Sequence, residues 1–209
     1  MIGRIIETPA CVAEGADWLC KAEPRFLPII QKCNPLPLRR KPEGFAELLS
    51  AITSQQVSVA SAKAIWGRLE GAGMTSVQAI TQTTDEDLRA LGLSRQKARY
   101  AKALADAQID FDALQHATNE DVIKTLTGVT GIGVWTAEIY AMFSLGRADV
   151  FAHGDLALQE GAKHLLDLPE RPKEKAMREI AKAWSPWRSV AARALWAHYA
   201  DLKSREGVR

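Results

Sequence analysis

The sequence predicts an all-α protein, and two observations support that prediction. Apolar residues recur at helical spacing through almost the entire chain, whereas alternating runs of β-branched residues between turn signals are nearly absent. The chain has 209 residues, of which 47% are hydrophobic, and this is enough to bury one substantial core. We therefore expect one compact helical unit.

Helical periodicity and capping patterns place the expected helices along the chain. From the N-terminus they span residues 10–21, 24–33, 43–53, 57–70, 75–81, 85–91, 94–107, 119–126, 134–145, 155–168, 172–184 and 187–202. The helix at 119–126 follows Thr118, with Asp121 three residues later, which is a capping pattern. Residues 34–42 contain three prolines and cannot continue a helix, so we expect them to link an N-terminal helical pair to a central bundle.

A glycine-containing turn at residues 129–133 separates two of these helices. Gly131 and Gly133 permit backbone angles closed to other residues, and without Cβ atoms they let a large anion approach the main-chain N–H groups. The following helix directs its positive end to the same point. This helix-hairpin-helix arrangement is typical of a DNA-binding site, although a plain turn between helices has the same pattern.

Asp155 opens the helix expected at 155–168, whose apolar residues fall on one face. An aspartate at such a position commonly caps the helix. A helix N-terminus also lowers the pKa of a carboxylate and keeps it ionised, which suits the stabilisation of a developing sugar cation or the orientation of a water molecule. The residues alone leave both roles open.

Aromatic residues gather near the hairpin and Asp155 in the sequence. Such residues form walls on which a base turned out of the double helix can stack, and a cationic alkylated base gains a further cation–π energy of about 1–2 kcal/mol when desolvated. Two other tryptophans, Trp18 and Trp66, are expected in the core. The residues of the expected wall are Trp135, Tyr140, Trp184, Trp187 and Trp196.

A polar turn interrupts the apolar helices between residues 53 and 58. Gln55 and Gln56 stand there in tandem. Amides bond both to bases and to backbone, so these side chains are suited to filling the gap that a flipped base leaves. Buried amides in an ordinary turn are the other interpretation.

Composition limits the class of protein only weakly. The net charge of +2 permits nucleic acid as a partner without demanding it. Cys11, Cys20 and Cys33 are irregularly spaced and no cysteine follows them, which excludes a C-terminal iron–sulfur cluster. No segment has the character of a signal peptide or a membrane span. We expect no membrane partner, and a location in the cytoplasm beside a bacterial nucleoid or in the nucleus of a eukaryote.

Five motifs occur in the order and spacing of the helix-hairpin-helix DNA glycosylases, and from Phe45 to Tyr199 the chain most resembles the short, all-α form of the 3-methyladenine DNA glycosylase II family. The motifs are ITSQQVS at 52–58, LGLSRQKA at 91–98, GIGVWTA at 131–137, VFAHGDL at 150–156 and WSPWRSVAA at 184–192. The resemblance implies one glycosylase unit, residues 1–209, with two helical lobes and a DNA-binding cleft between them. Lobe one is the central bundle at 43–145, and lobe two combines residues 1–42 and 146–209.

The resemblance also implies a function: removal of alkylated purines, of the 3-methyladenine and 7-methylguanine type, from duplex DNA by base flipping, which leaves an abasic site. Asp155 is the implied catalytic residue, and Trp135, Trp196 and Tyr140 are expected to line the base pocket. Gln56 is the implied wedge, and His153 is expected at the surface or against a phosphate. The expected DNA-binding residues are Thr130, Gly131, Gly133, Thr136, Gln55, Gln56, Ser58 and His153. Carbonyls of Thr127 and Thr130 are expected to bind sodium or potassium, with no other cofactor.

The chain departs from some relatives at informative places. Those that also cut the strand carry a lysine nucleophile two residues after the second hairpin glycine, where this chain has Trp135, so strand cleavage through a Schiff base is not expected. The wedge is Gln56 where some relatives have leucine, and the N-terminal β-rich lobe of the best-known bacterial member has no place in so short a helical chain.

Three alternatives stay open at this stage. The same scaffold accepts other damaged bases, such as uracil, hypoxanthine or an oxidised base. A non-catalytic helix-hairpin-helix DNA-binding protein would use Asp155 only as a cap. An unrelated helical interaction protein would leave the ordered motifs unexplained. We expect a monomer.

Overall fold

The structure is a computed structural model that describes residues 2–205. It confirms the all-α class, because the described residues form only helices, connecting segments and one isolated antiparallel bridge between Ile5 and Arg147. The chain divides into two units, of which unit 1 takes residues 1–40 and 138–209 and unit 2 takes residues 41–137. The boundary between the units after residue 137 lies inside helix α10 (Val134–Phe143). The lobe boundary expected from the sequence lies after residue 145, beyond the end of that helix.

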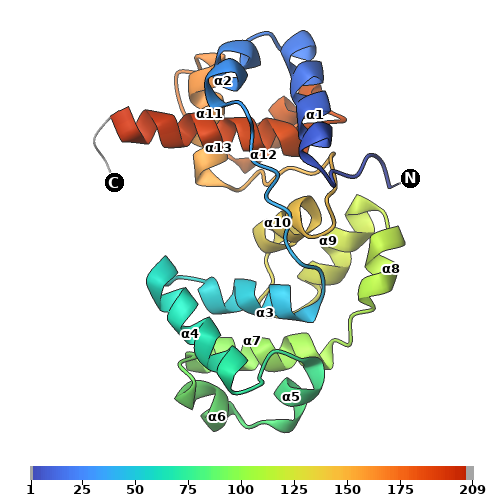
Figure 1. Ribbon diagram of the computed structural model, residues 1–209, viewed down its shortest axis with the longest axis vertical. Coiled ribbons are helices and arrows are strands. Elements are labelled where there is room, and N and C mark those ends of the chain that lie inside the picture. Colours follow the sequence, from blue (N-terminus) through green and yellow to red (C-terminus); the bar gives the residue numbers. More distant parts are fainter. Residues whose placement is uncertain (1, 206–209) are drawn as a thin grey trace. The chain divides into compact units, whose positions relative to one another are not determined.

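Unit 2 is a bundle of short helices around α3 and α7. Its helices are α3 (Phe45–Ser54), α4 (Val59–Gly71), α5 (Val77–Gln82), α6 (Asp85–Ala90), α7 (Arg95–Asp106), α8 (Phe111–His116), α9 (Asn119–Thr127) and the start of α10. Helix α3 packs on α4 and α7, and α5 and α6 pack on α7 (Figure 1). Leu48, Leu49 and Ile52 of α3 are completely buried, and this apolar face fixes the helix that leads into the Gln55 turn.

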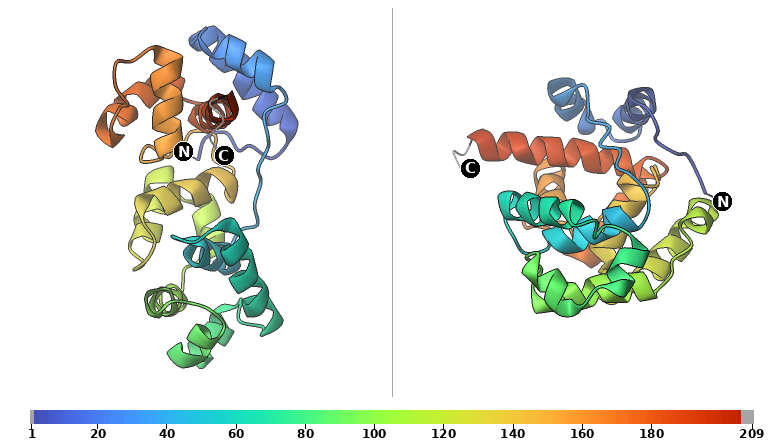
Figure 2. Two further views of the ribbon diagram at one scale, coloured as in Figure 1. Left: turned by 90° about the vertical axis from the view of Figure 1, so that its left-hand side faces the viewer. Right: turned by 60° about the horizontal axis from the view of Figure 1, so that its bottom comes forward.

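Unit 1 joins both ends of the chain around one long helix. It contains α1 (Pro9–Ala22), α2 (Phe26–Cys33), the rest of α10, α11 (Leu156–Leu166), α12 (Glu174–Ala181), the 3-10 turn η1 (Lys182–Trp184) and α13 (Arg188–Arg205). Helices α1, α2 and α11 all pack on α13 (Figure 2). Val190, Ala191, Ala194 and Leu195 of α13 have no exposed surface, so this helix forms the centre of the core.

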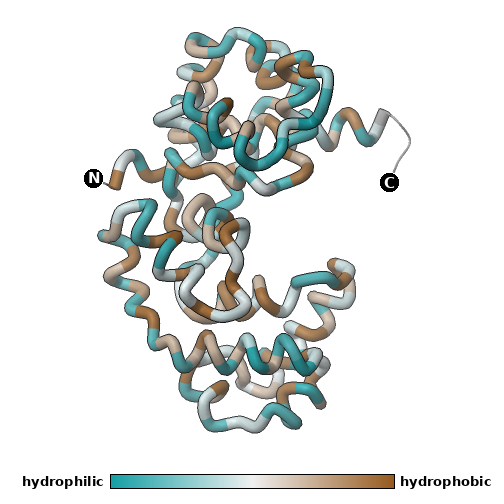
Figure 3. The backbone as a smooth tube through the Cα atoms, turned by 180° about the vertical axis from the view of Figure 1, so that it is seen from behind, coloured by the Kyte–Doolittle hydropathy of each residue, from teal (hydrophilic) through white to brown (hydrophobic). Residues whose placement is uncertain are grey.

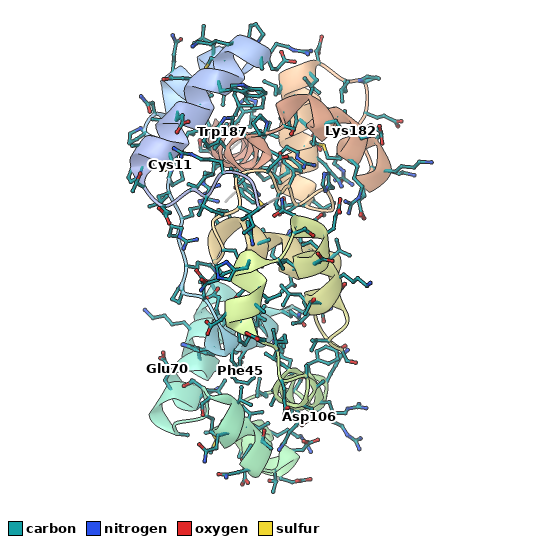
Figure 4. The ribbon with its side chains drawn as sticks, turned by 90° about the vertical axis from the view of Figure 1, so that its right-hand side faces the viewer. Cys11, Phe45, Glu70, Asp106, Lys182 and Trp187 are labelled. Atoms are coloured by element: carbon teal, nitrogen blue, oxygen red, sulfur yellow. The ribbon has the colours of Figure 1, made fainter. Side chains whose placement is uncertain are left out.

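Two tryptophans expected beside the site belong instead to the core of unit 1. Trp184 is 1% exposed, with its ring centroid 5.4 Å from that of Phe26 and 5.6 Å from that of Phe151. Trp187 points into the unit, whereas Lys182 points outward (Figure 4). A Cβ on Gly15 would lie 2.6 Å from the Trp187 ring, so α1 packs directly on this side chain. The expectation that Trp184 and Trp187 form an aromatic wall for a base is wrong.

The linker at residues 34–42 forms no helix, as the prolines predict. Arg193 of α13 is completely buried and holds the linker by donating to the carbonyls of Pro37 over 3.2 Å and Leu38 over 2.9 Å. The guanidinium also donates to the Ser189 carbonyl over 2.8 Å. Backbone carbonyls rather than a carboxylate therefore satisfy this buried cation.

Side-chain caps and amphipathic faces explain where most helices begin and how they pack. Hydrophobic and hydrophilic residues are interspersed along the helical parts of the chain (Figure 3). The side chains that accept a hydrogen bond from the first turn of their helix are those of Thr8, Ser58, Ser76, Thr84, Ser94, Asp110, Thr118 and Asp155. Every expected helix is present with ends shifted by a few residues, and α8 is one that the sequence did not predict. Within residues 2–205 no helix is both long and apolar enough to cross a membrane.

Candidate functional site

The hairpin joins α9 to α10, and Gly131 gives it its shape. The φ angle of Gly131 is +100°, a conformation that residues with a Cβ rarely adopt. A Cβ at this position would also lie 2.3 Å from Cγ of Tyr100, so the ring packs directly on the glycine. The Ile132 N–H donates to the Val129 carbonyl over 3.0 Å and closes the turn. Position 131 therefore requires glycine for two separate reasons.

The hairpin residues expected to contact DNA differ in their exposure. Thr130 and Gly133 are exposed, and a Cβ built on Gly133 would meet no atom within 4 Å. Trp135, in the first turn of α10, is 48% exposed. Thr136 is only 7% exposed, because it lies with Ala137 on the face of α10 that is turned toward the core. The Thr136 side chain is therefore not at the surface, contrary to the expectation.

The turn between α3 and α4 is bonded to the hairpin within unit 2. Nε2 of Gln55 donates to the Gly131 carbonyl over 3.0 Å. Gln56 is exposed and has a left-handed backbone conformation with φ +53°, and Ser58 caps α4 by accepting the Ser61 N–H. The Gln55 amide is thus hydrogen-bonded within the protein, and Gln56 is the exposed glutamine of the turn.

A hollow of about 250 Å³ lies beside this turn in unit 2. Lys97 forms part of its wall, and its ammonium donates to the Thr53 carbonyl at the end of α3 over 2.7 Å. Burial lowers the pKa of Lys97. The sequence motif at 91–98 pointed to this helix without giving its residues a role. The lining residues are Gln55, Gln56, Val57, Ser94, Gln96, Lys97 and Tyr100.

Asp155 caps α11 in unit 1 and is half-buried. Its Oδ1 accepts the N–H of Ala157 over 2.9 Å and the N–H of Leu158 over 3.0 Å. The indole Nε1 of Trp196 donates to the same oxygen over 3.2 Å. The structure therefore brings together two of the predicted site residues, which are 41 positions apart in the sequence.

Trp196 is itself surrounded by charged and aromatic groups. Its ring lies 5.7 Å from that of Phe143, and the Arg39 guanidinium sits over it at 5.4 Å from the ring centroid. Arg39 comes from the linker and has a positive φ of 53°. Tyr140 is only 3% exposed, so it belongs to the packed interior and not to an open wall. Sequence reasoning missed Arg39 and Phe143 because neither lies in a recognised motif.

His153 departs most clearly from expectation. It was expected at the surface or against a phosphate, but it is only 6% exposed. Its Nδ1 lies 3.0 Å from Oε1 of Glu138, which is 4% exposed. The surface assignment is wrong because a buried carboxylate 15 residues earlier in the chain provides the imidazole with an interior partner.

The known proteins that are similar to this chain are DNA repair proteins. Residues 49–186 match the model of the HhH-GPD superfamily base excision DNA repair proteins. The DNA-3-methyladenine glycosylase 1 of Schizosaccharomyces pombe is 30% identical over 181 residues, which cover 82% of this chain and 79% of the relative. A crystal structure of a DNA-3-methyladenine glycosidase from Bacillus halodurans matches with a TM-score of 0.80 and 33% identity, over 96% of this chain and 94% of that one.

A further solved structure is the S. pombe 3-methyladenine DNA glycosylase in complex with abasic DNA. It matches with a TM-score of 0.71 and 30% identity, and covers 84% of this chain and 95% of that one. The family model spans more than half of the chain and includes the Gln55 turn, the hairpin and Asp155. The chain therefore belongs to the HhH-GPD superfamily of base excision DNA repair proteins.

Proposed function

We propose that this protein is a DNA glycosylase that hydrolyses the N-glycosidic bond of alkylated purines in duplex DNA. The observation that carries the proposal is Asp155, whose carboxylate is fixed at the start of α11 by two main-chain N–H groups and the Trp196 indole. Relatives named as 3-methyladenine glycosylases support an alkylated purine as the substrate. The products are the free base and an abasic site.

The proposed reaction begins with rotation of the damaged nucleotide out of the stack, which costs less when damage has weakened its base pair. Gln56 enters the gap, and the Trp196 ring, whose indole is bonded to Asp155, offers a face on which the base stacks. The bond from C1′ to the base nitrogen then breaks, and its electron pair leaves with the base, so that a cationic purine departs as a neutral molecule. Asp155 stabilises the oxocarbenium-like sugar, and water adds at C1′ with loss of a proton.

The hairpin supplies the proposed grip on the DNA backbone. Its exposed Gly133 lies at the N-terminus of α10, where N–H groups and the helix dipole favour a phosphate. We propose that a sodium or potassium ion, held by the carbonyls of Thr127 and Thr130, adds positive charge there. The main-chain hydrogen bonds within the hairpin are accepted by two other carbonyls, those of Leu126 and Val129.

The same proposal includes hydrolysis without strand cleavage. A lyase step needs an amine that attacks C1′ and forms a Schiff base. Trp135 occupies the position at which lysine-bearing relatives place that amine, and an indole cannot perform this attack. Breaks should therefore appear in the treated DNA only after alkali.

The deciding experiment uses alkylated duplex DNA with the wild type and Asp155→Asn. Free 3-methyladenine and 7-methylguanine are measured by chromatography, and strand breaks are measured before and after alkali. Asp167→Asn is the matched control, because Asp167 lies at the other end of α11 in a left-handed conformation that asparagine also adopts. We expect release by the wild type and the control, and the loss of most release by Asp155→Asn.

Three results would change the assignment. Normal turnover by Asp155→Asn would leave Asp155 as a helix cap only. Release of uracil, hypoxanthine or an oxidised base in place of alkylated purines would keep the reaction and change the substrate. Binding of DNA without release of any base would indicate a non-catalytic DNA-binding protein.

A further inference from the structure

His153, which lies two residues before the proposed catalytic Asp155, forms a buried pair with Glu138. Their side chains are 7% and 5% exposed, and Nδ1 of His153 lies 3.0 Å from Oε1 of Glu138. With Glu138 as a carboxylate, which only accepts hydrogen bonds, the donor of this contact is the Nδ1–H of His153. The pair therefore fixes the orientation of the imidazole ring.

Glu138 is unusually poorly neutralised for a buried carboxylate. Besides His153, its Oε1 has Arg178 of α12 as a partner at 3.4 Å, and that arginine is closer to Glu174, at 2.7 Å. Its Oε2 is buried without a hydrogen-bond partner among the described residues. Burial of a charge in this way is costly. A polar pair buried at such a cost is a candidate for a functional role.

The main chain of His153 is anchored as firmly as its ring. Its carbonyl accepts a hydrogen bond from Nε2 of Gln159 in α11 over 2.8 Å, and Gln159 is itself buried. The Asp155 N–H donates to the Ala152 carbonyl over 3.0 Å. The segment from 152 to 155 is thus tied to α10 through Glu138 and to α11 through Gln159.

We propose that Glu138 and His153 are positioning residues that set the place of the segment 152–155, and with it the position of the Asp155 carboxylate at the start of α11. The inference rests on the proposed glycosylase function. Neither side chain needs to touch DNA or the reacting atoms. The imidazole acts as a strut between Glu138 and the main chain that carries Asp155, and loss of the strut lets the segment at 152–155 shift, which moves the capped carboxylate away from C1′.

The test compares His153→Leu, which removes the donor, with His153→Asn, whose amide N–H can take the place of the Nδ1 hydrogen. His164 is a matched control because it forms a His–Glu contact with Glu160 over 3.4 Å on the exposed side of α11. The corresponding variants are His164→Leu and His164→Asn. Single-turnover base release, the Kd for DNA and thermal unfolding are measured for all five proteins.

We expect His153→Leu to slow base release roughly 10- to 100-fold, as misplacement of a reacting group does, while the Kd stays within about twofold of the wild-type value. His153→Asn should recover most of the rate, and the His164 variants should match the wild type. An unchanged rate in His153→Leu would overturn the proposal. So would equal rates in His153→Leu and His153→Asn, or a slower rate fully explained by unfolded protein. No base release by the wild type would refute the proposed function itself, and this inference with it.

Discussion

At the scale of single residues, one oxygen of Asp155 serves both the helix and the site. Oδ1 accepts two main-chain N–H groups of α11 and the indole N–H of Trp196. The cap and the proposed catalytic role are therefore not competing interpretations, since capping is how the protein holds the carboxylate still. Sequence pattern alone could not decide between them because the partner on α13 is 41 residues away.

The two roles of Asp155 can be separated by their different demands on the side chain. Asparagine caps a helix about as well as aspartate, whereas alanine does not. We expect Asp155→Asn to keep the free energy of unfolding within about 0.5 kcal/mol of the wild-type value, and Asp155→Ala to lower it by about 1 kcal/mol. Urea denaturation measures both.

Base release should fall similarly in both Asp155 variants, because each lacks the charge that stabilises the sugar cation. A release rate that follows stability, with Asp155→Asn nearly normal, would contradict the separation of the two roles. The Asp167→Asn control on the same helix guards against a general effect of removing one carboxylate.

At the scale of elements, the hairpin is bonded to its surroundings inside unit 2. Tyr100 of α7 packs on Gly131, and Gln55 from the α3–α4 turn bonds to the Gly131 carbonyl. The hairpin proposed to bind a phosphate and the turn that carries the proposed wedge, Gln56, are thus held together by a hydrogen bond. A change at either element should be felt at the other.

Exchange of each hairpin glycine for alanine tests this description. Gly131→Ala places a Cβ against Tyr100 in a left-handed backbone conformation, so we expect the free energy of unfolding to fall by about 1–3 kcal/mol or more. Gly133→Ala meets no atom and should change stability by less than about 0.5 kcal/mol. Urea denaturation is again the measurement, and equal losses in the two variants would argue against the geometry of the turn.

Sequence periodicity was reliable for helices of several turns and weaker for shorter features. Of the three six-residue helices in the described part of the chain, α5 and α6 were predicted, whereas α8 was missed although Asp110 caps it. The core positions of Trp184 and Trp187 could not be predicted, because their packing partners lie on α1 and α2 at the other end of the chain. The burial of His153 likewise depends on Glu138.

At the scale of the whole molecule, the balance of charge is nearly even, with a net charge of +2. Affinity for DNA must therefore come from local contacts with phosphates more than from an overall attraction. The hairpin is the proposed place for these contacts. Their number is accessible from the dependence of binding on salt.

We expect the logarithm of the DNA-binding constant to fall linearly with the logarithm of salt concentration. The slope should be about −0.9 for each phosphate contacted, since counterions are released on binding. Fluorescence anisotropy with labelled duplex measures the slope. Asp155→Asn should share the wild-type slope, because the proposed role of this residue lies in chemistry, and a binding constant independent of salt would be incompatible with the proposed interface.

The assembly of unit 1 from both ends of the chain has a consequence for biosynthesis. Phe26 of α2 packs on Trp184, and α1 packs on Trp187, so these early helices obtain their partners only after all of unit 2 has been synthesised. At about 5–20 residues per second, the ribosome makes Trp184 roughly 10–30 s after Phe26. During that interval the continuous segment of unit 2 can fold, while the faces of α1 and α2 that later pack on α13 remain uncovered and available to chaperones.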